Sequence, residues 1–363
     1  MQTALDAGAS WRGAVAVSGG GDSTALMVLI AEWARSESRE PPLVLTVDHG
    51  LRPGSPRHAA AVLAQAGAAR LDAHVLRWRG RKPVSDVESA ARTARYDLMG
   101  EWCSMHGITC LYVAHTLEDQ AETFLLRLAR GSGVDGLSAM SVVSEYPLPG
   151  FAGLRLARPL LGVLRARLRA VLTGRRMSWQ EDAMNADPRF ARARLRAAWP
   201  DLERLGLSAK RIADAARHLS RARAALEKEV EALLRLATQR KGQCVVLDGA
   251  RLAAAPDEIG LRALACVLMQ VSGQSFRPRM ERLERLMAAI QSGVIGKGRT
   301  LHGCCIRTAA GRKGCFGPQT LRIAPEPRTR RVGWEKRGSG GDERNSDVKG
   351  NSKRELPGPG KNS

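Results

Sequence analysis

Short apolar runs alternate with longer stretches of helical hydrophobic spacing over the first half of the chain. The runs Ala14–Val17, Leu43–Val47 and Cys110–Ala114 predict buried strands, and Leu71–Trp78 predicts an alternating strand. The helices predicted between these strands span residues 24–33, 57–66, 87–106 and 117–130. Strands that alternate with helices predict an α/β fold with a doubly wound, mostly parallel sheet.

The second half of the chain has a different pattern, which begins after Pro200. A charge-rich helical linker region runs to about residue 242, and a small mixed α/β unit follows it. In this unit the pattern predicts a strand at 245–247, helices at 256–271 and 278–291, and short strands around 299–306 and 320–323. From Pro325 the chain is rich in Gly, Ser, Pro and Asn, which predicts a disordered basic tail. We therefore expect three parts, at residues 1–200, 201–324 and 325–363.

Charge is the strongest compositional signal. The 363 residues include 57 Lys and Arg against 36 Asp and Glu, which gives a formal net charge of +21. This excess points to a polyanionic partner, either nucleic acid or a membrane surface. Residues 151–200 are the densest basic stretch of the part expected to be folded, with eleven arginines and no lysine. No apolar run approaches the ~18 residues of a membrane span, so we expect no membrane-spanning segment.

Cysteine usage and the start of the chain indicate where the protein works. The 7 cysteines include no C-x-x-C pair, so neither a zinc ribbon nor a disulfide framework is indicated. Residues 1–10 contain an acidic residue and no basic segment, which is not the pattern of a signal peptide. Reduced thiols without an export signal predict a cytoplasmic protein.

A glycine-rich segment between the first predicted strand and helix has the composition of a phosphate-binding loop. It consists of Ser18, Gly19, Gly20, Gly21, Asp22 and Ser23. Consecutive glycines let several backbone N–H groups converge on one point, and the following helix adds the positive end of its dipole. No lysine follows, so the segment is not a G-x-x-x-x-G-K-[ST] loop, and its glycine spacing does not match a G-x-G-x-x-G loop either. The alternative is a plain turn in which Asp22 or Ser23 caps the helix.

The segment Ser18–Ser23 resembles the S-G-G-x-D-S loop of the PP-loop ATP pyrophosphatases, which cleave ATP to AMP and diphosphate. Further motifs follow in order, and together they resemble the tRNA(Ile)-lysidine synthase family over roughly residues 12–200. These motifs are Val47–Arg52 (VDHGLR), Ala114–Thr123 (AHTLEDQAET), Arg130–Leu137 (RGSGVDGL), Arg158–Leu161 (RPLL), Trp179–Asn185 (WQEDAMN) and Arg192–Arg196 (RARLR).

The resemblance implies an enzyme that joins free L-lysine to C2 of the wobble cytidine, C34, of the isoleucine tRNA with a CAU anticodon. In this family the C2 oxygen attacks the α-phosphate of ATP, and the ε-amine of lysine then displaces AMP. ATP and Mg²⁺ are the implied cofactors. Ser18–Ser23 and Asp48 are the expected ATP-binding residues, and Asp22 is a candidate ligand of Mg²⁺.

Two acidic residues on the predicted helix 117–130 join Asp22 in the candidate catalytic set. Asp119 and Glu122 are three residues apart and share a helix face, so they suit either the ammonium of lysine or a metal ion. The alternative is a solvated acidic helix start that the helix dipole favours. The family pattern has Asp where Glu118 stands, so Glu118 keeps the charge with a longer reach.

Arginines of the basic stretch are the candidate tRNA ligands. The resemblance assigns Arg158, Arg192, Arg194 and Arg196 to tRNA, whose phosphates they would hold by charge. The alternative is that their methylene stems pack against the fold.

Two other functions stay open at this stage. Another PP-loop enzyme, such as a cytidine thiolase, usually needs cysteine pairs for sulfur or a cluster, and the chain has no C-x-x-C pair. A non-catalytic RNA-binding relative would not need the intact Ser18–Ser23 loop together with Asp119 and Glu122. The sequence also leaves the oligomeric state open, and a homodimer is one alternative.

Overall fold

The structure is a computed structural model of the chain that describes residues 1–51, 54–83, 85–181, 187, 189–309 and 316–327. Arg52, Asp182 and Asn185 of the family motifs lie outside the described residues, as do residues 328–363 of the expected tail. The chain divides into two compact units. The first comprises residues 1–237 and 251–263, and the second comprises residues 238–250 and 264–363.

A six-stranded sheet organises the first unit, in the order β3-β2-β1-β4-β6-β5. The strands are β1 Ala14–Ala16, β2 Leu43–Asp48, β3 Ala73–Arg77, β4 Cys110–Tyr112, β5 Val143–Glu145 and β6 Arg155–Ala157. All neighbours pair in parallel except β5, which runs antiparallel to β6 at one edge. The predicted doubly wound, mostly parallel sheet is confirmed. Its strand order reverses at β1, and sheets of this kind bind ligands at such a point.

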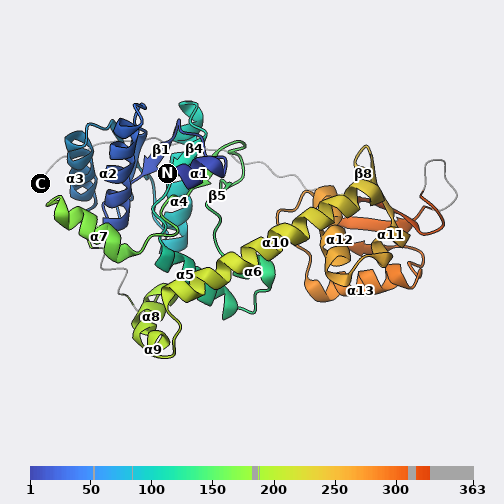
Figure 1. Cartoon of the computed structure of the whole chain (residues 1–363). Helices are drawn as coiled ribbons and strands as arrows, with labels where there is room; N and C mark the ends of the chain where they lie inside the picture. Colours follow the sequence, from blue (N-terminus) through green and yellow to red (C-terminus); the bar gives the residue numbers. More distant parts are fainter. Residues whose placement is uncertain (52–53, 84, 182–186, 188, 310–315, 328–363) are drawn as a thin grey trace, which may run out of the picture. The chain divides into compact units, whose positions relative to one another are not determined.

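Helices cover both faces of this sheet (Figure 1). Helices α1 Gln2–Asp6, α2 Gly21–Ser36, α3 Ser55–Ala68 and α7 Arg165–Gly174 pack in one core, and α4 Val87–Met105 packs in the other. The unit also contains α5 Leu117–Leu128, α6 Val134–Leu137, α8 Ala191–Ala197, α9 Trp199–Arg204 and α10 Ala209–Ala237. Successive residues of β1 face opposite sides because side chains alternate along a strand. Val15 packs in the core that contains α2, α3 and α7, whereas Ala14 packs in the core that contains α4.

The described residues of the basic stretch 151–200 belong to the first unit. Residues 155–157 form β6 inside the sheet, where Leu156 and Ala157 are buried. In α7, Leu168 and Leu172 are buried in the core, and arginines occupy other positions of the helix. The start of α7 therefore has a defined place, which is part of the site described below.

Helix α10 packs along α5 and α6 within the same unit (Figure 1). Ile212 of α10 shares a small core with Ala121 of α5. Arg223 of α10 donates a hydrogen bond to the Ser138 hydroxyl, directly after α6, at 2.9 Å. Helix α10 therefore supports the helix that carries Asp119 and Glu122.

The second unit contains a five-stranded antiparallel sheet in the order β7-β8-β11-β10-β9. Its strands are β7 Thr238–Lys241, β8 Cys244–Asp248, β9 Arg299–Leu301, β10 Cys304–Thr308 and β11 Thr320–Pro325. The helices of this part of the chain are α11 Gly249–Ala254, α12 Asp257–Ser272 and α13 Met280–Gln291. Among the described residues of the whole chain, no helix combines the length and apolar composition that crossing a membrane requires.

Candidate active site

The segment Ser18–Ser23 forms a tight loop between β1 and the first turn of α2. The Ser18 amide donates a hydrogen bond to the Ser23 hydroxyl at 3.1 Å, and the two hydroxyl groups lie 3.2 Å apart. The Ser23 hydroxyl donates to the Gly20 carbonyl at 3.0 Å. The first N–H groups of a helix have no partner within the helix, so this loop ends at a group of donors suited to an anion.

A second segment, residues 178–180, lies against the loop. The Gln180 amide donates to the Gly19 carbonyl at 3.0 Å. Gly19 has a φ of +85°, a left-handed conformation that glycine adopts without strain. A Cβ atom on Gly21 would lie 3.2 Å from the Trp179 ring. The backbone conformation therefore favours glycine at position 19, and a side chain at position 21 would press against Trp179.

Asp119 and Glu122 lie on one face of α5, and both are buried, with 8% and 1% of their surface exposed. Thr116 caps the helix, and its amide and hydroxyl donate to Asp119 Oδ2 at 2.8 and 2.9 Å. The Asp119 amide donates back to the Thr116 hydroxyl at 3.4 Å, which completes a capping box. Burial argues against a solvated helix start, and the capping box fixes the Asp119 carboxylate in one position.

Arg165, the first residue of α7, connects all three predicted carboxylates. Its guanidinium donates to Asp22 Oδ2 at 3.1 Å, Asp119 Oδ1 at 2.5 Å and Glu122 Oε1 at 3.3 Å. The backbone amide of Arg165 donates to both carboxylate oxygens of Glu118, at 3.0 and 3.1 Å. Glu118 thereby caps the positive end of α7 and holds Arg165 beside the carboxylates.

Arg196, near the end of α8, supplies a second cation. Its Nε and Nη2 atoms donate to the two oxygens of Glu122 at 2.7 and 3.1 Å. Its Nη2 atom also lies 4.0 Å from Asp119 Oδ1. A guanidinium that contacts both oxygens of a carboxylate fixes their relative orientation. The structure therefore brings Arg196 to the carboxylates, and its expected contact with tRNA stays a prediction.

The carboxylate cluster comprises Asp22, Asp119, Glu122, Arg165 and Arg196. Burial raises the pKa of Asp22, and the positive charge of Arg165 opposes this change. Burial also acts to raise the pKa of Asp119, but Arg165 and the Thr116 amide outweigh it and hold the pKa below its usual range. Three carboxylates and two guanidinium groups leave one net negative charge when all are ionised. Glu118, which bonds the Arg165 amide, adds a further negative charge beside the cluster.

Asp48 is the last residue of β2, His49 follows it, and the two form a separate polar group. Asp48 accepts hydrogen bonds from the Ser55 hydroxyl and, at 3.0 Å, from the Gly50 amide, and these bonds lower the pKa of Asp48. A ring nitrogen of His49 lies 3.1 Å from Arg95 Nη2. Burial and the charge of Arg95 lower the pKa of His49 to about 4, so this histidine is neutral at pH 7. Asp48 closes the turn after β2, and its contact with ATP stays a prediction.

The other three arginines expected to bind tRNA lie in different environments. Arg158 is buried, with 9% of its surface exposed, and donates to the Ser141 carbonyl at 2.9 Å and the Ser144 hydroxyl at 3.0 Å. Arg194 is exposed on α8, and Arg192 is half-buried there. The Arg158 guanidinium is engaged inside the first unit, and the tRNA contacts of Arg158, Arg192 and Arg194 stay predictions.

Comparisons with known proteins identify the family. The PP-loop domain family matches residues 3–201. The chain is 42% identical to the tRNA(Ile)-lysidine synthase of Methylobacterium sp. (strain 4-46) over 342 residues, which cover 91% of this chain and 94% of that protein. The chain belongs to the tRNA(Ile)-lysidine synthase family. Another member, from Bradyrhizobium sp. (strain BTAi1 / ATCC BAA-1182), is 39% identical over 335 residues, which cover 88% of this chain and 91% of that protein.

The similarity to this family extends past the predicted motifs. The motifs end near residue 200, whereas the matched lengths of both lysidine synthases exceed 330 residues. Among solved structures, the U34-tRNA thiolase NcsA from Methanococcus maripaludis covers 59% of this chain and the chain covers 72% of it, with a TM-score of 0.47 and 14% identity. A likeness of that size carries no statement about function.

Sequence reasoning missed Arg165. The residue stands in the run Arg165, Arg167 and Arg169, whose members look alike in sequence. In the structure Arg167 and Arg169 are exposed, and only Arg165 reaches the carboxylates. Its position at the first turn of a helix, capped by Glu118, is the feature that distinguishes it.

Proposed function

We propose that this chain joins lysine to C2 of the wobble cytidine, C34, of the CAU-anticodon isoleucine tRNA and cleaves ATP to AMP and diphosphate. The observation that carries the proposal is the contact of Arg165 with Asp22 of the phosphate loop and with Asp119 and Glu122 of α5. This contact joins a group suited to ATP and its metal with groups suited to an ammonium. Membership of the lysidine synthase family supports the same reaction.

ATP fits the phosphate loop, and Mg²⁺ fits Asp22. Asp22 Oδ2 bonds Arg165, whereas Asp22 Oδ1 makes no hydrogen bond or ion pair with any residue that the structure describes. Carboxylate oxygens are the ligands that Mg²⁺ prefers, so we propose Asp22 as its protein ligand. When bound there, Mg²⁺ would polarise the phosphate that cytidine attacks. The N–H groups at the start of α2 would hold the phosphates.

Lysine fits the other two carboxylates. A carboxylate can accept about four hydrogen bonds. Asp119 accepts two bonds from Thr116 and one from Arg165, and Glu122 accepts one from Arg165 and two from Arg196. Each therefore keeps about one acceptor position, and together they can bind an ammonium, which has three donors.

The cluster also explains how one site can serve two chemical steps. A carbonyl oxygen is a poor leaving group, so cytidine must first be adenylated, and AMP can then leave when the amine attacks C2. Arg165 contacts the carboxylate proposed for the first step and those proposed for the second, and it holds them close together. The cluster lies within one chain, so the reaction can proceed in a monomer or in a homodimer. We place it in the cytoplasm, with its tRNA substrate.

Two cysteines of the first unit do not suit the chemistry of a cytidine thiolase. Cys103 and Cys110 are buried in the cores of the first unit. Burial raises the pKa of Cys103 to about 12 and that of Cys110 to about 11, so neither is a thiolate at neutral pH. The described residues also contain no group of three or more His, Cys, Asp or Glu arranged to hold a metal ion.

Single-turnover assays that follow diphosphate and lysidine separately test the assignment. We expect Asp119→Asn and Glu122→Gln to keep diphosphate release and to weaken the lysine dependence of lysidine formation. Loss of one charge-assisted hydrogen bond is worth about 1.5–3 kcal/mol, which corresponds to roughly 10- to 150-fold in apparent lysine affinity. We expect Asp22→Ala to abolish diphosphate release.

A matched control is Glu32→Gln, which removes a carboxylate that pairs with Arg175 at the surface. This variant should behave as the wild type in both assays. If Asp119→Asn and Glu122→Gln instead fail to release diphosphate and added lysine does not restore activity, these carboxylates serve the metal and not lysine. Near-normal turnover by Asp22→Ala would contradict its proposed role.

A further inference from the structure

The edge strand β3 continues into a basic segment that the proposed chemistry does not use. Residues 77–82 read Arg-Trp-Arg-Gly-Arg-Lys and contain no acidic residue. Arg77, Arg79 and Arg81 are exposed, and none of them makes a hydrogen bond or ion pair with the described part of the chain. Arg77 stands opposite Asp48 in the β2–β3 register and lowers the pKa of Asp48 without bonding it. Three guanidinium groups are therefore available to an anionic partner.

The last residue of this segment has a different role. The Lys82 ammonium lies 4.0 Å from the centre of the Trp78 ring and donates to the Trp78 carbonyl. This contact folds the segment back on itself after the strand, because a cation over an aromatic face is attracted to it. The Trp78 ring also meets the His49 ring edge to face, with centroids 6.3 Å apart. The loop that carries the arginines is thus anchored beside the turn that follows β2.

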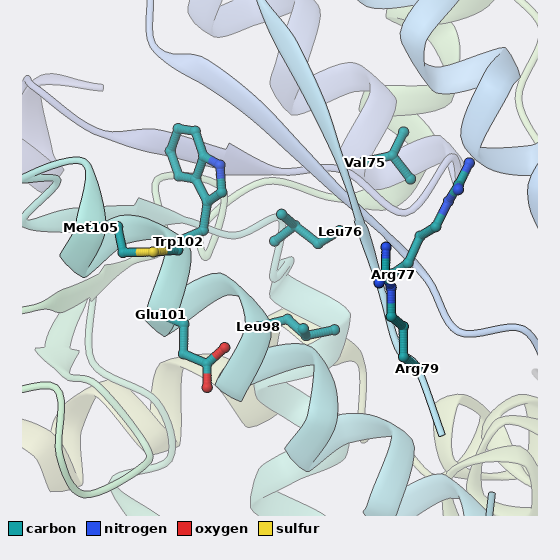
Figure 2. A pocket seen from close by; sticks show the side chains of 8 residues that line it. All are labelled: Val75, Leu76, Arg77, Arg79, Leu98, Glu101, Trp102 and Met105. Carbon is teal, nitrogen blue, oxygen red and sulfur yellow. The ribbon is translucent and has the colours of Figure 1, made fainter. Parts of the chain in front are cut away.

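A pocket of about 360 Å³ lies next to the arginines, between β3 and α4 (Figure 2). Its lining includes Leu76, Leu98, Trp102, Arg77, Arg79 and Glu101. Figure 2 shows Arg77 and Arg79 on the β3 side of the pocket, and Trp102, Glu101 and Met105 on the α4 side. Met105 is 75% exposed, which is unusual for a large apolar side chain. The pocket thus combines apolar walls with one acceptor and two cations.

A nucleotide has the chemistry that this surface would recognise. A base has apolar faces that contact leucine, methionine and tryptophan side chains, and its edge carries amino groups that a carboxylate such as Glu101 can accept from. The volume lies near the lower end of the ~300–1,000 Å³ that is typical of small-ligand pockets. Arginine suits the neighbouring phosphates because its planar fork can donate two hydrogen bonds to one phosphate.

We propose that this edge of the first unit is a tRNA-binding surface, separate from the catalytic cluster, in which one unstacked nucleotide occupies the pocket. Its base lies against Leu76 and Leu98, and the adjacent phosphates contact Arg77, Arg79 and Arg81. The proposal rests on the proposed function, since the polyanion is the tRNA substrate. An acidic protein segment is the competing occupant, and it is an outcome of the test.

Binding of the isoleucine tRNA by the full chain, measured at several salt concentrations, tests the arginines. Loss of one phosphate contact lowers the slope of log affinity against log salt by about 1. We expect Arg77→Ala and Arg79→Ala each to weaken binding roughly 3- to 10-fold at low salt, and the double variant to lower the slope by about 2. The matched control is Arg12→Ala, which removes an exposed arginine just before β1 and should change binding less than either variant.

A second pair of variants tests the pocket. Met105→Glu places a negative charge at the rim, at an exposed position where folding tolerates it, and should weaken tRNA binding about 10-fold. Leu236→Glu adds the same charge at another exposed position of the first unit and should not weaken tRNA binding. Ultraviolet cross-linking should attach a nucleotide to a peptide that contains Trp102 or Met105.

The outcomes separate this proposal from the proposed function. If the wild type binds tRNA and makes lysidine but Arg77→Ala, Arg79→Ala and Met105→Glu match it, the surface does not bind tRNA and an acidic protein becomes the remaining candidate. If the wild type neither binds tRNA nor makes lysidine, the proposed function itself is wrong. Reduced binding in both arginine variants, with a lower salt slope, supports the surface.

Discussion

At the scale of single residues, the candidate site depends on Arg165 because it is the cation that touches every carboxylate of the cluster. It bonds Asp22 from α2 and Asp119 and Glu122 from α5. Removing one partner from a buried ion pair leaves an uncompensated charge in a poorly solvated place, which is strongly destabilising. Arg165 should therefore matter to folding as well as to chemistry.

We expect Arg165→Met to lower the free energy of unfolding by about 3–5 kcal/mol at pH 7. The loss of stability should be smaller at pH 5 than at pH 7. Burial raises the pKa of Asp22, and without Arg165 no cation opposes this change, so the carboxylates become neutral at a higher pH in the variant than in the wild type. Urea denaturation at pH 7 and at pH 5 measures this loss of stability. Arg167→Met, an exposed position on the same helix, should change stability by less than ~0.5 kcal/mol. A deficit that is equal at the two pH values would contradict this account.

At the scale of elements, the turn from β1 into α2 places different demands on neighbouring glycines. Gly19 has a φ of +85° and lies against Gln180, whereas Gly20 has a φ of −72°, and a Cβ there would meet only the Ser18 hydroxyl at 3.6 Å. A side chain in the left-handed region costs about 1–2 kcal/mol. The conformation of the loop, and not glycine content as such, therefore decides which position tolerates a side chain.

We expect Gly19→Ala to lower the free energy of unfolding by about 1–2 kcal/mol and to displace the Gln180 segment. Gly20→Ala should change it by less than ~0.5 kcal/mol, because its backbone is compatible with alanine. Thermal and urea unfolding of the two variants make the comparison independent of catalysis. Equal losses of stability in Gly19→Ala and Gly20→Ala would show that the left-handed conformation of Gly19 is not the reason for glycine at that position.

At the scale of the whole molecule, two neutral histidines make stability depend on pH. Burial lowers the pKa of His49 and of His115 to about 4, from 6.5. Below pH 6.5 the unfolded chain takes up protons at both sites and the folded chain does not. The stability that these groups contribute is therefore complete above pH 6.5 and is lost as the pH falls toward 4.

We expect the free energy of unfolding to fall between pH 6.5 and 4.5 by up to about 1.4 kcal/mol per pH unit for each histidine. The low pKa of Asp119 confines its own loss of stability to more acidic solutions, and the raised pKa of Asp22 acts in the opposite direction to the histidines. Urea denaturation across the window measures the slope. The variant His49→Gln/His115→Gln should flatten it, and an unchanged slope would rule out these two side chains as its source.

Local patterns in the sequence were sufficient for part of the site. The strand–glycine–helix order of Ser18–Ser23 predicts the phosphate loop, because a few adjacent residues determine it. The spacing of Asp119 and Glu122 predicts a shared helix face, since residues three apart meet on a helix. Both features are present in the structure. The resemblance also assigned Arg158 and Arg196 to tRNA; in the structure Arg158 is buried and Arg196 bonds Glu122, and their contact with tRNA stays a prediction.

The sequence by itself determined the parallel α/β sheet, the phosphate loop and the candidate carboxylates, because periodicity and spacing act over a few residues. Only the tertiary structure decided which cations meet those carboxylates. Arg165 and Asp22 are 143 residues apart and meet because β1 and β4 are neighbours in the sheet and α7 packs against α2. Such contacts depend on strand order and on the packing of buried faces. Arg165 bonds the carboxylates and Arg167 is exposed, but the residues around them in the sequence do not distinguish one from the other.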